Sequence, residues 1–396
     1  MRDSDKFSAG VDFLPIHDIM VLCKVENGRI AILPGIGQPC PEGGIGVKYE
    51  FFVGSYGGQQ EENIVRFSLD GQTGSITKRY SCKGIENPSW LTLHPGKNIL
   101  YAVEELVPEG NIRAYGVEEE GLRLLAAFPS KGADPCHICM DGKEEHLLIA
   151  NYTSGSISLY RVDANGIPIK MTEFVQHEKE KESGCVPTES GRDPIRQEGP
   201  HVHFSGVMGQ RIFVLYLGLD KVFVYDLDDA GGSLRDTGRY LPCPAGAGPR
   251  HLAFHPGVSV LYAVCELDNK LAVFREKEGE YALESMLSTL PESYMGENTA
   301  AAIRIWGNLL MVSNRGHDSI AVFSIQEDGS LSPRQIIPTG GKIPRDFAVM
   351  GEYVVIANQG SDEITVLRIN LETKLLERTG ISVAMSRPAC ICPVTP

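Results

Sequence analysis

The sequence contains a strand-forming unit that recurs seven times. One motif opens with Pro or a small residue and continues as a short apolar strand, as in Pro135-Cys-His-Ile-Cys-Met140 and Pro249-Arg-His-Leu-Ala-Phe254. Its copies begin at residues 88, 135, 200, 249, 299, 344 and 388. A period of roughly 40 to 50 residues is typical of propeller blades, each of which is a four-stranded sheet. The repeat therefore favours a closed array of similar units over two or three unrelated domains.

Two further strand motifs recur with the same period. One is a β-branched strand that ends in polar residues, as in Leu148-Ile-Ala-Asn-Tyr152, and the other follows it, as in Ile320-Ala-Val-Phe323. Strands rich in Val, Ile, Tyr and Phe, separated by turns that draw on 43 Gly and 24 Pro, predict antiparallel sheets. The fold class that we predict is all-β, a seven-bladed β-propeller of four-stranded antiparallel blades.

The order of the motifs also predicts how the ring closes. The chain enters the repeat with a second-strand motif at Phe52 and ends on a first-strand motif at Pro388. The amino- and carboxyl-terminal strands are thus expected to share one blade, which leaves no open sheet edge. We assign residues 48–396 to the propeller and 1–47 to an amino-terminal extension of unknown role. The long interval before the third copy predicts a loop over 177–199 on one face.

The net charge and the hydropathy of the chain argue against some classes of binding partner. The formal net charge of -14 argues against nucleic acid and against anionic membrane surfaces, both of which attract basic proteins. No apolar run approaches the ~18 residues of a transmembrane helix. The amino-terminal residues lack the apolar core of a secretory signal, so we expect a cytoplasmic protein. The sequence does not indicate an oligomeric state.

Ten cysteines are scattered along the chain, mostly in apolar stretches. This distribution is typical of reduced, buried thiols rather than of a disulfide framework. Cys136 and Cys139 form a CxxC motif without a partner motif at zinc-site spacing, so we expect them to pack as small apolar residues. The sequence therefore predicts neither a metal nor another cofactor.

The ends of the strands carry the polar residues of interest. In an antiparallel meander, the start of the first strand and the end of the second lie on the same edge of the blade, so seven blades gather these ends around one mouth of the central channel. Alignment at the Pro places Ser89, Cys136, His201, Arg250 and Arg345 in one ring, followed by Trp90, His137, Val202, His251 and Asp346. The second strands end at Ser55, Tyr56, Glu104, Asn151, Tyr152, Tyr216, Glu266, Asn314, Arg315, Asn358 and Gln359. Because these residues differ from blade to blade, they indicate an asymmetric small-molecule site.

Four of these residues form the candidate catalytic set: His201, Arg250, Glu266 and Arg315. A histidine or a carboxylate can accept a proton, and two guanidinium groups can bind an anion and a developing oxyanion. Candidate substrate-binding residues are His203, His251, Arg345, Tyr56, Asn151, Asn314 and Tyr216. The alternative is structural, with Arg250 and Glu266 as an ion pair within one blade and His201 as a hydrogen-bonded turn residue. The His201-x-His203 pair has no third metal ligand at fixed spacing.

Known catalytic motifs narrow the class further. The chain has no GxSxG nucleophile elbow, no GxxxxGK[ST] phosphate loop and no HExxH metal motif. These absences argue against a serine hydrolase of the α/β class, a nucleotide-binding enzyme of the P-loop class and a zinc protease.

At these residues the sequence resembles the bacterial 6-phosphogluconolactonase family of seven-bladed propellers, which is similar to the fungal carboxy-cis,cis-muconate lactonizing enzyme. The matching segments are Arg196-Gln-Glu-Gly-Pro-His-Val-His203, Gly246-Ala-Gly-Pro-Arg-His-Leu-Ala-Phe-His-Pro256, Leu261-Tyr-Ala-Val-Cys-Glu266, Gly296-Glu-Asn-Thr-Ala-Ala-Ala302, Ser313-Asn-Arg-Gly-His-Asp-Ser-Ile320 and Pro344-Arg-Asp-Phe347. The resemblance implies that His201, Arg250, Glu266 and Arg315 belong to the active site. One departure is Tyr216, where the family usually has Asp, and this exchange predicts a phenol at the rim.

The expected function is metal-independent hydrolysis of a sugar-acid lactone such as 6-phosphogluconolactone. His201 or Glu266 would activate water, and Arg250, Arg315 and Arg345 would form a positive funnel for a small anionic substrate. Two alternatives stay open: a cycloisomerase that forms or opens a muconolactone, and a non-catalytic propeller that binds a ligand or a protein.

Overall fold

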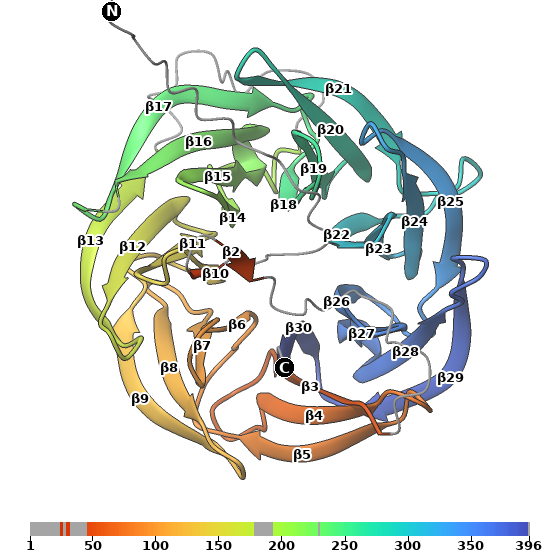
Figure 1. The fold of residues 1–396 in the computed structure, drawn as a ribbon, viewed down its shortest axis with the longest axis horizontal. Coiled ribbons are helices and arrows are strands. Elements are labelled where there is room, and N and C mark those ends of the chain that lie inside the picture. The colour runs from red at the N-terminus through yellow and green to blue at the C-terminus, as the bar shows by residue number, and fades with distance from the viewer. Residues whose placement is uncertain (1–23, 27–28, 32–45, 178–192, 229, 395–396) are drawn as a thin grey trace, which may run out of the picture.

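The structure is a computed structural model that describes residues 24–26, 29–31, 46–177, 193–228 and 230–394. Seven four-stranded antiparallel sheets are arranged as blades around a central axis (Figure 1). The predicted seven-bladed β-propeller is therefore confirmed.

Each blade begins with a strand next to the axis and moves outward. The first complete blade in chain order holds β6 (Leu91–Leu93), β7 (Ile99–Glu104), β8 (Asn111–Val117) and β9 (Leu122–Pro129). The next holds β10 (Pro135–Met140), β11 (His146–Asn151), β12 (Ser156–Val162) and β13 (Pro168–Gln176). It is followed by β14 (Val202–Met208), β15 (Arg211–Tyr216), β16 (Lys221–Asp228) and β17 (Ser233–Pro242).

The remaining blades repeat this order. They are β18 (Pro249–Phe254), β19 (Val260–Cys265), β20 (Lys270–Lys277) and β21 (Glu280–Ser288); β22 (Thr299–Trp306), β23 (Leu309–Arg315), β24 (Ser319–Ile325) and β25 (Leu331–Pro338); and β26 (Pro344–Met350), β27 (Tyr353–Asn358), β28 (Glu363–Ile369) and β29 (Leu376–Ala384).

The last blade closes the ring. Its inner strand is β30 (Pro388–Val394), which pairs with β3 (Lys48–Ser55), while β4 (Ile64–Asp70) and β5 (Ile76–Cys82) complete the sheet. Phe52 pairs with Cys392 in this register. The prediction that the two ends of the repeat share a blade is confirmed, and the pairing removes the open edges that an incomplete ring would have.

The core lies between neighbouring blades. Every residue of the second strands β7, β11 and β19 is buried, whereas the outer strand β21 is largely exposed. A strand that is covered on both faces needs apolar residues at every position, which explains why the second-strand motif is almost continuously apolar. Burial of each Leu, Ile or Val in it contributes about 1.5–3 kcal/mol.

The same backbone arrangement precedes the inner strand in six of the seven blades. In six blades a residue with a positive φ precedes the inner strand: Asn87, Asp134, His201, Gly248, Ile343 and Arg387. It lies directly before the strand in all of them but the first, where Asn87 precedes the strand start at Leu91 by four residues. The carbonyl of this residue accepts a hydrogen bond from the amide just after the second strand, as in Tyr152 N to Asp134 O (2.8 Å) and Glu266 N to Gly248 O (2.7 Å). The link holds the two strand ends together at the channel mouth.

This arrangement corrects the alignment of the repeats at Pro200. Val202 pairs with Tyr216 as Pro135 pairs with Asn151, so the inner strand of this blade starts at Val202 and not at Pro200. A β-bulge follows the first pair in both blades. The residue that corresponds to Cys136 and Arg250 is therefore His203, while His201 occupies the positive-φ position that precedes the strand. The sequence alignment was wrong by two residues here because the Pro was taken as the marker of the strand start.

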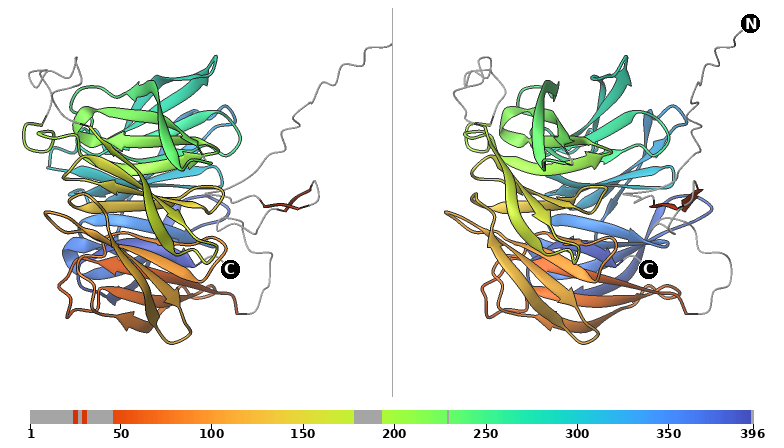
Figure 2. Two further views of the ribbon diagram at one scale, coloured as in Figure 1. Left: turned by 90° about the vertical axis from the view of Figure 1, so that its left-hand side faces the viewer. Right: turned by 60° about the vertical axis from the view of Figure 1, so that its left-hand side comes forward.

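Two predicted segments fall mostly outside the described residues. Of the extension 1–47, β1 (Lys24–Glu26) and β2 (Arg29–Ala31) form a two-stranded sheet of their own, which lies outside the ring (Figure 2). Of the expected loop 177–199, residues 178–192 lie outside the described residues. In the part of the chain that the structure covers, no helix is long and apolar enough to cross a membrane.

Candidate active site at the channel mouth

The centre of the candidate site is the carboxylate of Glu266, just after β19, which three guanidinium groups contact. Arg250 Nε lies 2.9 Å from Glu266 Oε2, and Arg315 Nη2 lies 3.0 Å from Oε1. The third is Arg196, whose Nη2 donates to Oε1 at 2.6 Å. Arg196 comes from residues 193–200, which lie outside the repeat, so three separate parts of the chain meet on one carboxylate. The ion pair between Arg250 and Glu266 is present, as the structural alternative predicted, and it is part of this larger cluster.

The charges in this cluster depend on one another. Burial alone would raise the pKa of Glu266, but Arg315, Arg250 and Arg196 outweigh it and hold this pKa well below its usual range. Burial and the neighbouring Arg315 lower the pKa of Arg250. Because both oxygens of Glu266 face guanidinium groups, this carboxylate is suited to orienting arginines rather than to accepting a proton.

His201 lies beside the cluster and contacts it through Tyr152. The two rings stack with centroids 4.5 Å apart, and His201 Nδ1 lies 3.2 Å from the carbonyl oxygen of Tyr152. A proton on Nδ1 is donated to that carbonyl, which leaves Nε2 as the nitrogen that can accept a proton. The carboxylate of Glu198 lies 3.0 Å from Nε2 and is largely exposed.

A group of buried histidines lies on the inner strands β10, β14 and β18. The rings of His203 and His251 are 5.3 Å apart, and His137 lies 6.3 Å from His251. Burial, reinforced by nearby arginines, lowers the pKa of all three well below the usual value of histidine. Arg250 Nη1 donates to His251 Nε2 at 2.9 Å, which requires a neutral imidazole. These side chains are buried, uncharged groups next to Arg250.

Arg345 and Tyr56 form a second polar group at the mouth. Arg345 Nη2 donates to the hydroxyl of Tyr56 at 2.6 Å, and that hydroxyl donates to Glu105 Oε2 at 3.0 Å. Ser89 also donates to Glu105 Oε2. The structure thus brings both predicted residues to the mouth and adds Glu105, which sequence reasoning missed.

A repeated segment of the sequence could have identified Glu105 as a candidate site residue. Leu100-Tyr-Ala-Val103 and Leu261-Tyr-Ala-Val264 are identical, and the second residue after each is a glutamate, Glu105 or Glu266. The strand motif instead predicted Glu104 as the polar residue at this strand end. Glu104 points elsewhere and forms an ion pair with Arg113 at 2.7 Å.

Three predicted substrate-binding residues lie away from the polar cluster. Asn151 and Asn314 are fully buried and donate to Ser130 O (3.3 Å) and Thr289 O (2.9 Å), where they tie strands together. Tyr216 is fully buried in the apolar core beside Phe223, with ring centroids 4.9 Å apart. The prediction of a phenol at the rim is therefore wrong. Side chains at neighbouring strand positions point in alternate directions, and the side chain of Tyr216 points into the core.

The structure also shows the surroundings of the cysteines and of the side chains that could bind a metal ion. Cys136 and Cys139 are buried in β10, with Cys139 Sγ 3.3 Å from Ser205 Oγ. The seven cysteines among the described residues are free thiols. Within those residues no group of three or more His, Cys, Asp or Glu side chains could hold a metal ion.

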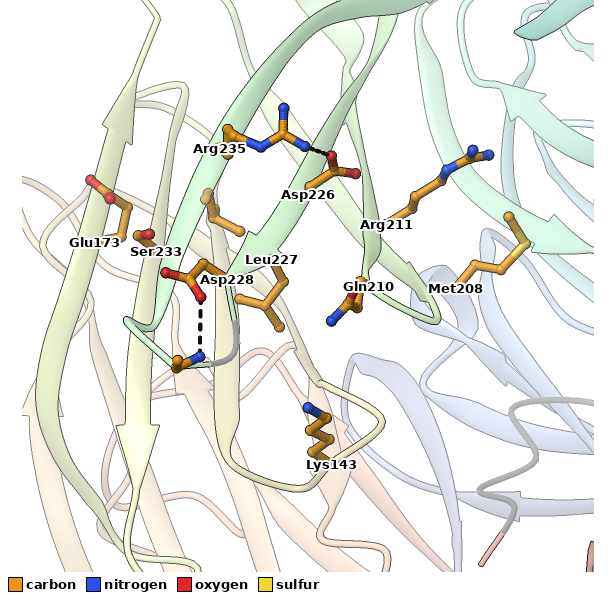
Figure 3. A pocket seen from close by; sticks show the side chains of 12 residues that line it. Lys143, Glu173, Met208, Gln210, Arg211, Asp226, Leu227, Asp228, Ser233 and Arg235 are labelled. Carbon is orange, nitrogen blue, oxygen red and sulfur yellow. Dashed lines mark hydrogen bonds and ion pairs between the residues drawn. The ribbon is translucent and has the colours of Figure 1, made fainter. Parts of the chain in front are cut away.

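An open hollow of about 1210 Å³ lies at another part of the ring. Its lining includes Lys143 and Gln210 in the turns after β10 and β14, Asp228 at the end of β16, and residues of the strands β13 and β17 (Figure 3). These turns join the other ends of the strands, so the hollow lies on the face opposite the candidate site. Arg235 in its wall forms an ion pair with Asp226.

Comparison with known proteins gives the site its context. Residues 50–393 match the family model described as a lactonase with a 7-bladed β-propeller. A 6-phosphogluconolactonase of Bacillus subtilis is 30% identical over 355 residues, which cover 87% of this chain and 98% of the relative.

Two solved structures support the same assignment. A protein from Lactobacillus plantarum has a TM-score of 0.79 at 29% identity, with 88% of this chain and 100% of that chain covered. A periplasmic gluconolactonase of Pseudomonas aeruginosa has a TM-score of 0.81 at 26% identity, with 88% and 100% covered. From its fold and its similarity to these proteins, the chain belongs to the lactonase family of seven-bladed β-propellers.

Proposed function

We propose that this protein hydrolyses a sugar-acid lactone, and that 6-phosphogluconolactone is its first candidate substrate. The observation that carries this proposal is the group of arginines at the channel mouth, where Arg196, Arg250 and Arg315 share one carboxylate. Three positive charges around one negative charge leave a local excess that suits an anionic substrate, although the whole chain is acidic. Guanidinium groups also bind phosphate and carboxylate with two parallel hydrogen bonds.

In the proposed reaction, water adds to the lactone carbonyl and His201 accepts its proton. Of the two candidate bases, Glu266 is held as a charged group by its arginines, whereas His201 Nε2 lies 3.0 Å from the carboxylate of Glu198. That carboxylate would stabilise the imidazolium that forms. Arg315 and Arg345, which are partly exposed, would contact the anionic group and the developing oxyanion.

A hydrolase assay tests this proposal directly. The purified chain is incubated with 6-phosphogluconolactone, in the presence and absence of a chelator, and acid release is followed by pH-stat. We expect hydrolysis well above the spontaneous rate that the chelator does not change. His201→Ala should lower kcat by about 10²- to 10⁴-fold, which is the usual contribution of a general base. Wild-type turnover in this variant would contradict the role of His201.

A second substrate is favoured by one comparison. The similarity to a periplasmic gluconolactonase makes the unphosphorylated gluconolactone the next candidate. The ratio of kcat/KM for the two lactones decides between them, because a site that binds the phosphate should lose affinity when the phosphate is absent. Absence of hydrolysis across the panel, together with tight binding of the sugar acid, would instead support the non-catalytic alternative.

A further inference from the structure

Glu105, just after β7, is a carboxylate at the channel mouth that the proposed reaction has not yet used. The hydroxyl of Tyr56 and the hydroxyl of Ser89 both donate to its Oε2 atom. Among the described residues Oε1 of Glu105 accepts no hydrogen bond, and it is not among the buried side-chain atoms that lack a partner. Glu105 therefore has one oxygen that is fixed by the protein and one that is open to the mouth.

The surroundings of Glu105 differ from those of Glu266. The ionisable groups that face it are Tyr56 from the end of β3, Arg345 from β26, Asp134 before β10 and Cys136 in β10. Burial raises the pKa of Glu105, Asp134 adds to this, and Arg345 and the two hydroxyl donors oppose it without reversing it. Arg345 is itself hydrogen-bonded to Tyr56 rather than to the carboxylate. Glu105 can thus hold a proton under conditions in which Glu266 cannot.

We propose that Glu105 is the general acid that protonates the leaving oxygen of the lactone. This inference rests on the proposed lactone hydrolysis and adds its second proton-transfer group. When two carboxyl groups in one site have surroundings that give them different pKa values, they usually have different roles in catalysis. Here Glu266 orients arginines, and Glu105 exchanges the proton.

Atoms and charge balance in the proposed step. Water adds to the carbonyl carbon and gives one proton to His201. The bond from this carbon to the ring oxygen then breaks, its electron pair stays on the oxygen, and Glu105 Oε1 supplies the proton that makes a hydroxyl. The product carboxylic acid ionises, and His201 and Glu105 return to their starting forms by exchange with solvent, so one lactone and one water give one hydroxy-carboxylate and one proton.

Tyr56 and Ser89 act as positioning residues in this scheme. Because both donate to Oε2, the proton of the carboxyl group is directed to Oε1. The hydrogen bond from Arg345 orients the Tyr56 hydroxyl so that its own proton points to Glu105.

The test compares Glu105→Gln with a matched control, Glu109→Gln. Glu109 lies in the same loop after β7 and is exposed, and among the described residues it forms an ion pair with Lys131 at 3.7 Å. We expect Glu105→Gln to lower kcat by about 10²- to 10⁴-fold and to remove the alkaline limb of its pH profile. Glu105→Asp should recover part of the rate, and Glu109→Gln should match the wild type.

A second variant keeps the inference testable if Glu105→Gln does not fold. Ser89→Ala removes a donor that favours the charged carboxylate, so the alkaline limb should move to higher pH while the protein remains active. Equal rates and equal pH profiles for Glu105→Gln and Glu109→Gln, in a wild type that hydrolyses lactone, would overturn this inference alone. A wild type that hydrolyses no lactone would overturn the proposed function and this inference with it.

Discussion

Glu105 and Glu266 occupy the same position in two blades and have different electrostatic surroundings. Each is the second residue after a Leu-Tyr-Ala-Val segment at the channel mouth. Glu266 is contacted by three guanidinium groups, and Glu105 is contacted by two hydroxyl groups. The repeat thus supplies equivalent backbone positions, and neighbours from other blades decide what each carboxylate can do.

Replacing Glu266 should destabilise the protein strongly. Glu266→Gln leaves three arginines, including the buried Arg250, without their carboxylate, and loss of one partner of a buried ion pair costs about 3–5 kcal/mol. Urea denaturation measures the effect. The control is Glu62→Gln, whose ion pair with Lys78 is half-exposed and should contribute less than about 1 kcal/mol. Equal losses in the two variants would contradict the anchoring role of Glu266.

Replacing Arg315 should reduce catalysis more than stability. Its side chain is 11% exposed at the mouth and donates to Glu266 and to the carbonyl of Ala300. Arg315→Gln should lower kcat/KM for 6-phosphogluconolactone by about 10²- to 10³-fold, as removal of an oxyanion donor does. Arg315→Lys keeps the charge without the two-pronged geometry and should recover only part of this loss. Steady-state kinetics that match the wild type in both variants would exclude Arg315 from the site.

Stability should fall as the pH drops below about 6.5, the ordinary pKa of histidine. His137, His203 and His251 have folded-state pKa values well below this value, so the unfolded chain binds protons that the folded chain does not. Each histidine should cost up to about 1.4 kcal/mol per pH unit in the window below 6.5. The raised pKa of Asp268, about 6, acts in the opposite direction and offsets part of the effect of one histidine.

Urea denaturation at a series of pH values from about 7.5 to about 5, on both sides of the ordinary pKa of histidine, measures this slope. His137→Phe keeps an aromatic ring against Trp90 and Phe204 and should reduce the slope by the share of one histidine. A stability that does not change with pH in this window would contradict neutral histidines in the folded state. Below the ordinary pKa of glutamate, Glu266 takes up a proton in the unfolded chain but stays charged in the folded chain, because its folded-state pKa is lowered, and this should add to the decline.

Tyr216→Phe should leave catalysis unchanged. The ring packs in the core against Phe223, away from the mouth, so its hydroxyl has no route to the substrate. We expect kcat/KM within about two-fold of the wild type and little change in the free energy of unfolding, because the variant keeps the aromatic ring that packs in the core. A kinetic assay and a denaturation curve on the same preparation check both values. A large loss of activity at unchanged stability would return Tyr216 to the site.

The fold could be predicted almost completely from the sequence. Three strand motifs, each repeated seven times, define the blades, and the positions of Phe52 and Pro388 in this pattern predict the shared closing blade. The prediction succeeds because blade formation depends on local strand preference and on the alternation of strands with turns. Both can be recognised in short segments of the sequence.

The register of one blade could not be predicted from the pattern. Pro200 resembles the start of the other inner strands, yet the strand begins at Val202. A shift of two residues keeps the same side chains on the same face, so the hydrophobic pattern does not detect it. Only the backbone pairing of Val202 with Tyr216 shows that His203 lies in the ring and that His201 precedes it.

The sequence by itself determined the number of blades, the way the ring closes and the strand ends at which polar residues gather. The tertiary structure alone decided which of these residues meet, because charges interact through space and not along the chain. Arg196, from outside the repeat, reaches Glu266, while Tyr216, from inside it, turns into the core. The same strand end therefore carries a fixed anion in one blade and, in the proposed reaction, a proton donor in another.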